Sequence, residues 1–217
     1  MASSIPSSHL KIFFPILLSF SLIFSISHPA IAASPSYSPP PPSNFTNTLK
    51  SYKAFIKQYC SSTTYPKNCY KYLSPYASVI KTSPLVLTKS SIYVSLKQTI
   101  KSYSALKSLT KVKGLTHNET QVIKDCYENI GDSLDEVKDS AAAVKNLTGG
   151  NTYEEAFEWS NIKTWMSAAI TSYYTCTDEF DELTIRGSLQ KKITTDVLKA
   201  ENMVSNALSC VNKFTSY

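Results

Sequence analysis

Four long segments of the chain repeat apolar residues every three or four positions, a spacing typical of helices that bury one face. The clearest segment runs from Lys124 to Asp139. When it is wound at about 100° per residue, its apolar side chains fall within roughly 40° of one line, and its carboxylates fall opposite them. The apolar stripe contains Cys126, Ile130, Leu134, Val137 and Ala141, and the acidic row contains Glu128, Asp132, Asp135 and Asp139.

Helix-start and helix-stop signals separate the four segments from one another. The starts are Ser83-Pro84 and the capping boxes Thr116-x-x-Glu119 and Thr152-x-x-Glu155, and the stops are Gly114, Gly149-Gly150 and Arg186-Gly187-Ser188. Because short connections force neighbouring helices to run antiparallel, the pattern predicts an all-α fold, an up-down-up-down four-helix bundle over residues 81–217. A solenoid is the alternative, but the chain has no repeat of fixed period.

A helical hairpin is predicted to precede the bundle, over residues 47–80. Apolar residues keep helical spacing from Asn47 to Cys60, and Pro66 suits the first turn of a second, short helix. Cys60 and Cys69 lie on either side of the break, with eight residues between them. A disulfide between them would close the hairpin and contribute about 2–3 kcal/mol.

The first 33 residues are typical of a secretory signal peptide. Lys11 precedes an apolar run from Ile12 to Ile26, and Ala30-Ile31-Ala32 supplies small residues for cleavage near Ala32 or Ala33. A membrane anchor is the alternative, but the run contains Pro15 and is shorter than the roughly 18 residues a span needs. The mature chain is therefore expected to be secreted and free of the membrane, with N-glycosylation candidates at Asn44, Asn118 and Asn146.

Residues 34–46 form a proline-rich arm between the signal peptide and the hairpin. Ser38-Pro39-Pro40-Pro41-Pro42 favours extended polyproline II and resembles the repeat unit of plant extensins. A stiff linker and a tether to the cell wall are both consistent with this composition.

The chemical inventory argues against several functions. The net charge of +6 is spread over several helices with no Lys/Arg run, which disfavours nucleic acid as a partner. After residue 33 only His117 remains, and the sequence has no Cys-x-x-Cys pair, phosphate loop or Gly-x-Ser-x-Gly elbow, so we expect no metal, no cofactor and no enzymatic activity. The acidic row lies opposite the core and lacks the cleft that acid–base chemistry requires.

The three remaining cysteines lie in apolar stripes. Cys126 and Cys176 belong to sequential helices and could link them, whereas Cys210 is expected to be a buried thiol, with an intermolecular link as the alternative.

Several of these features together resemble the plant invertase and pectin methylesterase inhibitor family, from about Asn47 to the end of the chain. The matching motifs are Cys60 with Thr63-Thr64-Tyr65-Pro66 and Cys69, Asp125-Cys126-Tyr127-Glu128, Trp165-Met166-Ser167-Ala168-Ala169-Ile170 and Thr175-Cys176-Thr177-Asp178-Glu179-Phe180. The resemblance implies a hairpin followed by a four-helix bundle. It also implies the disulfides Cys60–Cys69 and Cys126–Cys176, with Cys210 free.

The acidic helix is similar to that of the pectin methylesterase inhibitors. This resemblance implies that the esterase is contacted by Glu128, Asp132 and Asp135, and by Thr175 and Asp178, which lie beside Cys176. It further implies a free-standing protein of the cell wall, or apoplast, that covers the pectin cleft of the esterase in a 1:1 complex. Carboxylates facing an acid-rich cleft would bind better at acidic pH.

Other partners and roles stay open at this point. Acid invertase is the alternative partner, although the Pro-Lys-Phe motif of invertase inhibitors is absent from the chain. A non-inhibitory structural protein of the wall is the alternative from another class, and a lipid or small-ligand carrier would need a cavity that closely packed bundles lack.

Overall fold

The computed structural model describes residues 43–215, apart from the side chains of residues 43–45 and Asp181. The predicted signal peptide and residues 34–42 of the proline-rich arm lie outside the described residues. The described part contains no strand and is built from helices α1 (Ser43–Cys60), α2 (Pro66–Leu73), η1 (Ser74–Tyr76), α3 (Ala77–Ile80), α4 (Pro84–Leu109), α5 (His117–Val144), α6 (Tyr153–Glu182) and α7 (Gly187–Phe214).

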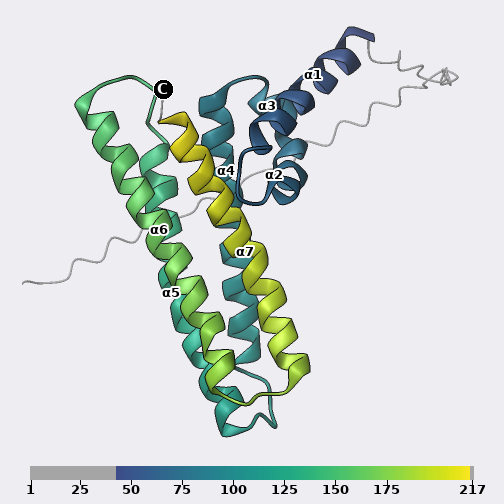
Figure 1. Ribbon diagram of the computed structural model, residues 1–217, viewed down its shortest axis with the longest axis vertical. Coiled ribbons are helices and arrows are strands. Elements are labelled where there is room, and N and C mark those ends of the chain that lie inside the picture. The colour runs from purple at the N-terminus through teal and green to yellow at the C-terminus, as the bar shows by residue number, and fades with distance from the viewer. Residues whose placement is uncertain (1–42, 216–217) are drawn as a thin grey trace, which may run out of the picture. The chain divides into compact units, whose positions relative to one another are not determined.

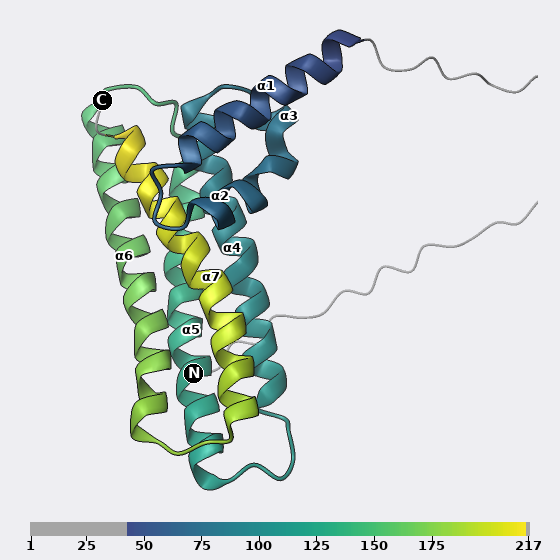
Figure 2. The same cartoon turned by 45° about the vertical axis from the view of Figure 1, so that its right-hand side comes forward.

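Helices α4 to α7 form an antiparallel four-helix bundle (Figures 1 and 2), which confirms the predicted fold class. Their apolar stripes meet in one core that runs the length of the bundle. Its fully buried members include Ile92, Ile130, Ile162, Met166, Ile193 and Val204. The acidic row of α5 is therefore turned away from the core, as its spacing predicts.

The shorter helices α1 to α3 pack at one end of the bundle (Figure 1). Their own small core joins Ile56, Leu73 and Ile80 to Leu87 of α4 and Met203 of α7. The turn before α2 is fixed to α7 by Asn206, whose side-chain oxygen accepts from the Tyr65 N–H at 2.8 Å and whose amide donates to the Tyr65 carbonyl at 3.1 Å. Helix α1 begins at Ser43, four residues before the predicted start.

Two of the three predicted helix starts have the expected caps. The Ser83 hydroxyl accepts from the Val86 N–H, and the Thr116–Glu119 capping box is complete. The second capping box is wrong in one half: Thr152 caps α6, but the Glu155 carboxylate accepts from the Thr148 and Gly149 N–H groups at 2.7 and 2.9 Å. The Glu155 carboxylate holds the preceding loop because Gly149, at φ +82°, turns the loop N–H groups toward this carboxylate.

The helix ends lie before the glycines that were expected to stop them. Helices α4 and α5 end at Leu109 and Val144, several residues before Gly114 and Gly149. Both glycines have positive φ and make the loops turn, rather than forming C-caps. Helix α6 ends at Glu182 and α7 begins at Gly187, so the break lies at residues 183–186, and Gly187 and Ser188 of the predicted break already belong to α7.

The structure contains both disulfides that the family resemblance implies. Cys60–Cys69 closes the turn between α1 and α2, and Cys126–Cys176 joins α5 to α6. Cys210 is a free and fully buried thiol, and burial raises its pKa to about 12. At that pKa the thiolate, which is the reactive form, is scarce at neutral pH.

Candidate partner-binding surface

The exposed and half-buried carboxylates on the outer sides of α5 and α6 define a surface, which we call the acidic face. On α5 it comprises Asp125, Glu128, Asp132, Asp135, Glu136 and Asp139, and on α6 it comprises Asp178, Glu179 and Glu182. Four of the five predicted contact residues, Glu128, Asp132, Asp135 and Asp178, belong to it. The fifth, Thr175, is exposed beside Cys176.

The Cys126–Cys176 disulfide, which we call the staple, sets the register of α5 and α6, with a Cα–Cα distance of 4.4 Å. Ser133 confirms that register two turns further on, because its hydroxyl donates to the Ala169 carbonyl at 2.9 Å. Both links are buried, so the spacing of the acidic groups on α5 relative to those on α6 is rigidly fixed.

This register divides the predicted contact residues into two levels. Glu128, Thr175 and Asp178 lie within two residues of a staple cysteine, at one level along the bundle. Asp132 and Asp135 lie about 9 and 13 Å beyond Cys126 along α5, given the rise of roughly 1.5 Å per residue. The five residues therefore form an elongated strip and not a single cluster.

Two members of the strip pair with lysines of their own helix. The Lys138 ammonium lies 2.8 Å from Asp135, and the Lys124 ammonium lies 3.7 Å from Glu128. All four side chains are more than half exposed, so such pairs add little stability and can be rearranged by a partner. The Thr175 hydroxyl donates to the Thr171 carbonyl, which leaves its oxygen lone pairs facing solvent.

Glu179 is the functional candidate that the sequence reasoning missed. Partial burial, together with the neighbouring charges of Asp125 on α5 and Glu182, raises the pKa of Glu179 to about 7. Glu136 behaves similarly: burial and the carboxylates of Asp139, Asp132 and Asp135 raise its pKa. One oxygen of each of these two glutamates is buried and has no hydrogen-bond partner among residues 43–215. The sequence signal that could have identified them is their position beside the contact between α5 and α6, the two helices that Cys126–Cys176 joins.

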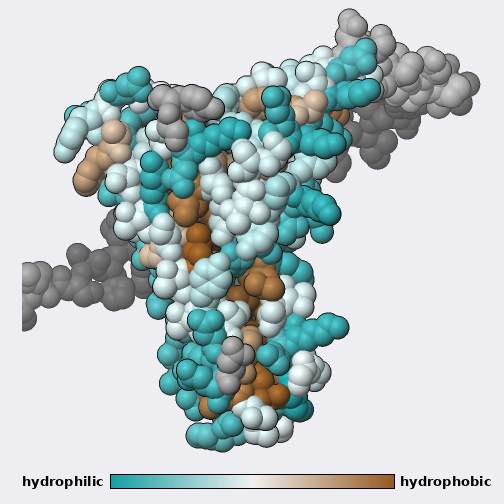
Figure 3. All heavy atoms as spheres, in the orientation of Figure 1, coloured by the Kyte–Doolittle hydropathy of each residue, from teal (hydrophilic) through white to brown (hydrophobic). Residues whose placement is uncertain are grey.

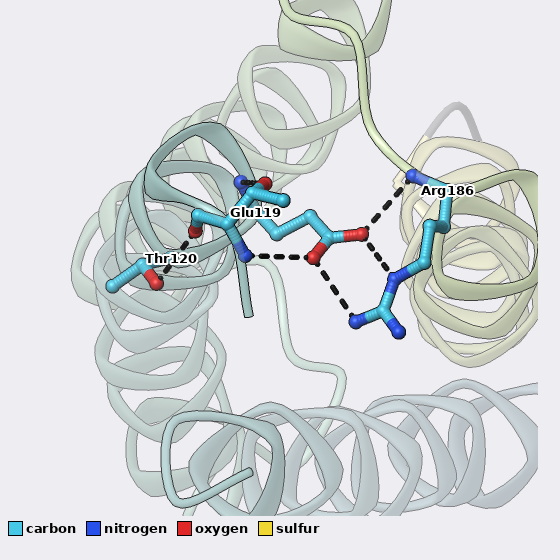
Figure 4. A network of polar contacts seen from close by, with 4 residues as sticks. Glu119, Thr120 and Arg186 are labelled. Carbon is cyan, nitrogen blue, oxygen red and sulfur yellow. Dashed lines mark hydrogen bonds and ion pairs between the residues drawn. The ribbon is translucent and has the colours of Figure 1, made fainter. Parts of the chain in front are cut away.

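The far end of α5 is fixed by a buried carboxylate (Figure 4). Glu119 is 1% exposed and accepts from the Thr116 N–H at 3.0 Å, the Arg186 N–H at 3.2 Å and the Arg186 guanidinium Nη2 at 3.0 Å. The Arg186 guanidinium is the first cause of the fall in the Glu119 pKa to about 2. This carboxylate joins the start of α5 to the start of α7.

A cavity of about 730 Å³ lies at the junction of the hairpin and the bundle, away from the acidic face. Its aromatic lining is supplied by Phe55, Tyr59, Trp159 and Phe214. It contains none of the predicted contact residues, and its volume would accommodate a small molecule. The acidic face, in contrast, is an exposed surface of the kind that a protein partner can cover.

Two of the three predicted glycosylation sites can be placed. Asn146 is exposed just after α5, and Asn118 is half-buried in the first turn of α5. The side chain of Asn44 lies outside the described residues. No helix among residues 43–215 combines the length and the apolar character needed to cross a bilayer.

A model of the plant invertase/pectin methylesterase inhibitor family matches residues 54–210. The chain belongs to this family. It is 38% identical over 162 residues to the 21 kDa protein of Daucus carota, a match that covers 75% of this chain and 84% of that protein. It is 32% identical to pectinesterase inhibitor 4 of Arabidopsis thaliana, over 78% of this chain and 85% of the inhibitor.

The chain is also similar to a part of one pectinesterase and, in fold, to solved structures. Pectinesterase 2 of Arabidopsis thaliana is 31% identical over 75% of this chain, a match that covers only 27% of the esterase. A crystal structure of a mutant form of a pectin methylesterase inhibitor from Arabidopsis superposes with a TM-score of 0.56. That match covers 72% of this chain and 95% of the inhibitor at 15% identity, so it supports the shared fold alone.

Proposed function

We propose that this protein is a secreted inhibitor of plant pectin methylesterase that covers the pectin-binding cleft of the enzyme with its acidic face in a 1:1 complex. The observation that supports this most is the rigid strip of exposed carboxylates on α5 and α6, held by Cys126–Cys176. A surface that is already ordered loses less conformational entropy when it docks, so more of the contact energy remains as affinity.

The inhibitor performs no chemistry in this proposal. Its carboxylates lie on the outer sides of two helices, and Glu136 and Glu179, whose pKa values are raised, are half-buried there. Inhibition follows from exclusion, because pectin cannot enter a cleft that the bundle covers. The match to inhibitors named for pectinesterase supports this partner over invertase.

The surface can be tested with the double variant Asp132→Ala with Asp178→Ala. These exposed residues lie on different helices and at the two levels of the strip, so their loss should weaken binding without disturbing the core. We expect the inhibition constant for a plant pectin methylesterase to rise at least tenfold, because several interface contacts are removed together.

A matched control is Glu154→Ala with Asp196→Ala, which also removes two negative charges but from positions outside the acidic face. Glu154 lies in the first turn of α6, about 36 Å from Asp178 along the helix. If both double variants inhibit as the wild type does, the surface assignment is wrong. If the wild type inhibits acid invertase but no pectin methylesterase in a parallel titration, the proposed partner is wrong.

A further inference from the structure

Glu201 of α7 is a buried carboxyl group whose hydrogen bonds are incomplete. It is 1% exposed. Its Oε1 accepts from the Ser205 hydroxyl at 2.8 Å and lies 3.5 Å from the Tyr65 hydroxyl. Its Oε2 has no hydrogen-bond partner within the described part of the chain. An unpartnered buried carboxylate is costly, so a group that supplies a donor to Oε2 would be held strongly.

A cavity of about 260 Å³ reaches Glu201 between α6 and α7. Its aromatic walls are Tyr173, Tyr174 and Phe180 of α6. Tyr174 is 49% exposed and Leu198 of α7 is 41% exposed, so both belong to its open side. Apolar surface is visible along the seam between α6 and α7 (Figure 3). We call this cavity the anchor pocket.

The lining of the anchor pocket selects for a cation. Glu201 is one of its lining residues, and a carboxylate there attracts an ammonium or guanidinium group and supplies it with a charge-assisted hydrogen bond. Aromatic rings along the walls attract the same groups through their π faces while covering the apolar stem that carries them. Among the described residues that line the pocket none is a lysine or arginine, so none of them supplies this charge.

The anchor pocket adjoins the proposed docking surface. Tyr174 and Thr177 line it, and they are the immediate neighbours of Thr175 and Asp178 on α6. A partner that covers Thr175 and Asp178 therefore also reaches the mouth of the pocket. The neighbouring hydroxyl of Tyr173 is held inside the bundle by Thr99 at 2.7 Å, so the ring is a fixed wall.

We propose that the anchor pocket receives one lysine or arginine side chain of the target esterase, with the cationic head on Glu201. This inference rests on the proposed function, since it assigns a residue type of the partner to a specific pocket. It extends the contact strip from the α5–α6 seam onto the α6–α7 seam. It also explains why a carboxyl group is kept at a buried position where an apolar residue would pack without cost.

The test compares Glu201→Gln with Asp196→Asn in binding to a plant pectin methylesterase that the wild type inhibits. Both variants remove one negative charge from α7, but Asp196 pairs with Lys199 and does not line the pocket. We expect Glu201→Gln to lower affinity at least tenfold, because it leaves the partner's charge buried without a counter-ion, and Asp196→Asn to change it less than twofold. Equal affinities of the two variants would overturn the inference.

A second pair of variants tests the pocket without changing the buried Glu201, whose substitution could alter folding. Tyr174→Ala removes an exposed wall of the pocket, and Tyr153→Ala removes a tyrosine that is 83% exposed in the first turn of α6. Tyr174→Ala should weaken the complex at least fivefold and Tyr153→Ala less than twofold. If Tyr174→Ala binds the esterase as the wild type does, the pocket is not part of the interface.

A probe distinguishes the partner side chain from a free amine. n-Butylammonium chloride is titrated into the free inhibitor and followed through the NMR signals of the glutamate side chains. We expect binding only at millimolar concentrations, because one cation without the rest of the interface has little affinity. Submillimolar binding, with no effect of Glu201→Gln on the esterase complex, would assign the pocket to a free amine instead. A wild type that binds no esterase would overturn the proposed function before the pocket is tested.

Discussion

Glu119 illustrates how one side chain can serve two helix starts. Its carboxylate completes the capping box of α5. It also accepts hydrogen bonds from the backbone N–H and the guanidinium of Arg186, the residue that precedes α7 (Figure 4). Four donors converge on two oxygens that are almost fully buried. The charge is therefore structural, and it lies at the end of α5 opposite the hairpin.

We predict that Glu119→Gln lowers the melting temperature by several degrees at pH 6. The amide presents an N–H₂ group where the carboxylate accepted hydrogen bonds, so at least one donor of Thr116 or Arg186 is left unpaired. Because the folded-state pKa of Glu119 is about 2 and its ordinary value is 4.5, its stabilisation is present above about pH 4.5 and is lost as the pH falls toward 2.

The measurement is thermal unfolding of both proteins at pH 6 and pH 2.5. The two melting temperatures should differ clearly at pH 6 and converge at pH 2.5. The control is Glu154→Gln, an exposed charge in the first turn of α6 that makes no contact with Arg186. A difference that stays constant between the two pH values would show that the ion pair is not its source.

At the scale of helices, the two disulfides differ in what they constrain. Cys60–Cys69 closes a separation of 9 residues within the hairpin, and Cys126–Cys176 closes a separation of 50 residues across the bundle. The longer loop loses more freedom in the unfolded chain, so the relation for loop closure gives about 4 kcal/mol for the staple and about 2.5 kcal/mol for the hairpin link.

We predict that Cys126→Ala with Cys176→Ala lowers the free energy of unfolding by about 4 kcal/mol, more than Cys60→Ala with Cys69→Ala does. Urea unfolding of both double variants beside the wild type measures the difference. The staple variant should also bind the esterase more weakly, because α5 and α6 are then free to shift the two levels of the acidic strip. Equal losses of stability would mean that strain or residual structure outweighs loop length.

Spacing and capping residues were enough to predict the helices, because each bundle helix carries its own apolar stripe and three of the four also carry a start signal. The helix ends were misplaced, since Gly114 and Gly149 were taken as caps and are loop residues with positive φ. Contacts between helices were harder to predict. Arg186 was interpreted as part of a break, and its role as the partner of Glu119 depends on the α6–α7 turn reaching the start of α5.

The candidate site was predicted on the side of α5 that its pattern exposed, and missed where two helices meet. Glu179 has no special local sequence, and its raised pKa comes from partial burial and from the charges of Asp125 on the neighbouring helix and Glu182. Glu201 lies on α7, outside the motifs that carry the family resemblance. Its pocket exists only because α6 supplies aromatic walls at that level. The physical reason is the same in both cases: helix register and burial are set by tertiary packing.

For the whole molecule, the proposed docking of the acidic face predicts that binding depends on pH. Burial and the charges of Asp125 and Glu182 raise the pKa of Glu179 to about 7, and burial and three carboxylates of α5 raise the pKa of Glu136. A docked partner removes more water from these groups, which penalises the ionised form further. Complex formation should therefore take up protons, and affinity should fall as the pH rises through the titration range of Glu179.

We predict that the wild type binds its esterase roughly three- to tenfold more tightly at pH 5 than at pH 8, and that Glu179→Gln reduces this ratio by at least half. The dissociation constant is measured by calorimetry at both pH values, since enzyme activity has its own pH dependence. Glu154→Gln, outside the acidic face, should keep the wild-type ratio. A flat profile of the wild type would exclude linked protonation. Tighter binding at pH 8 would show that the carboxylates around Glu179 meet cations of the partner, because a cation favours the ionised carboxylate and reverses the sign of the linkage.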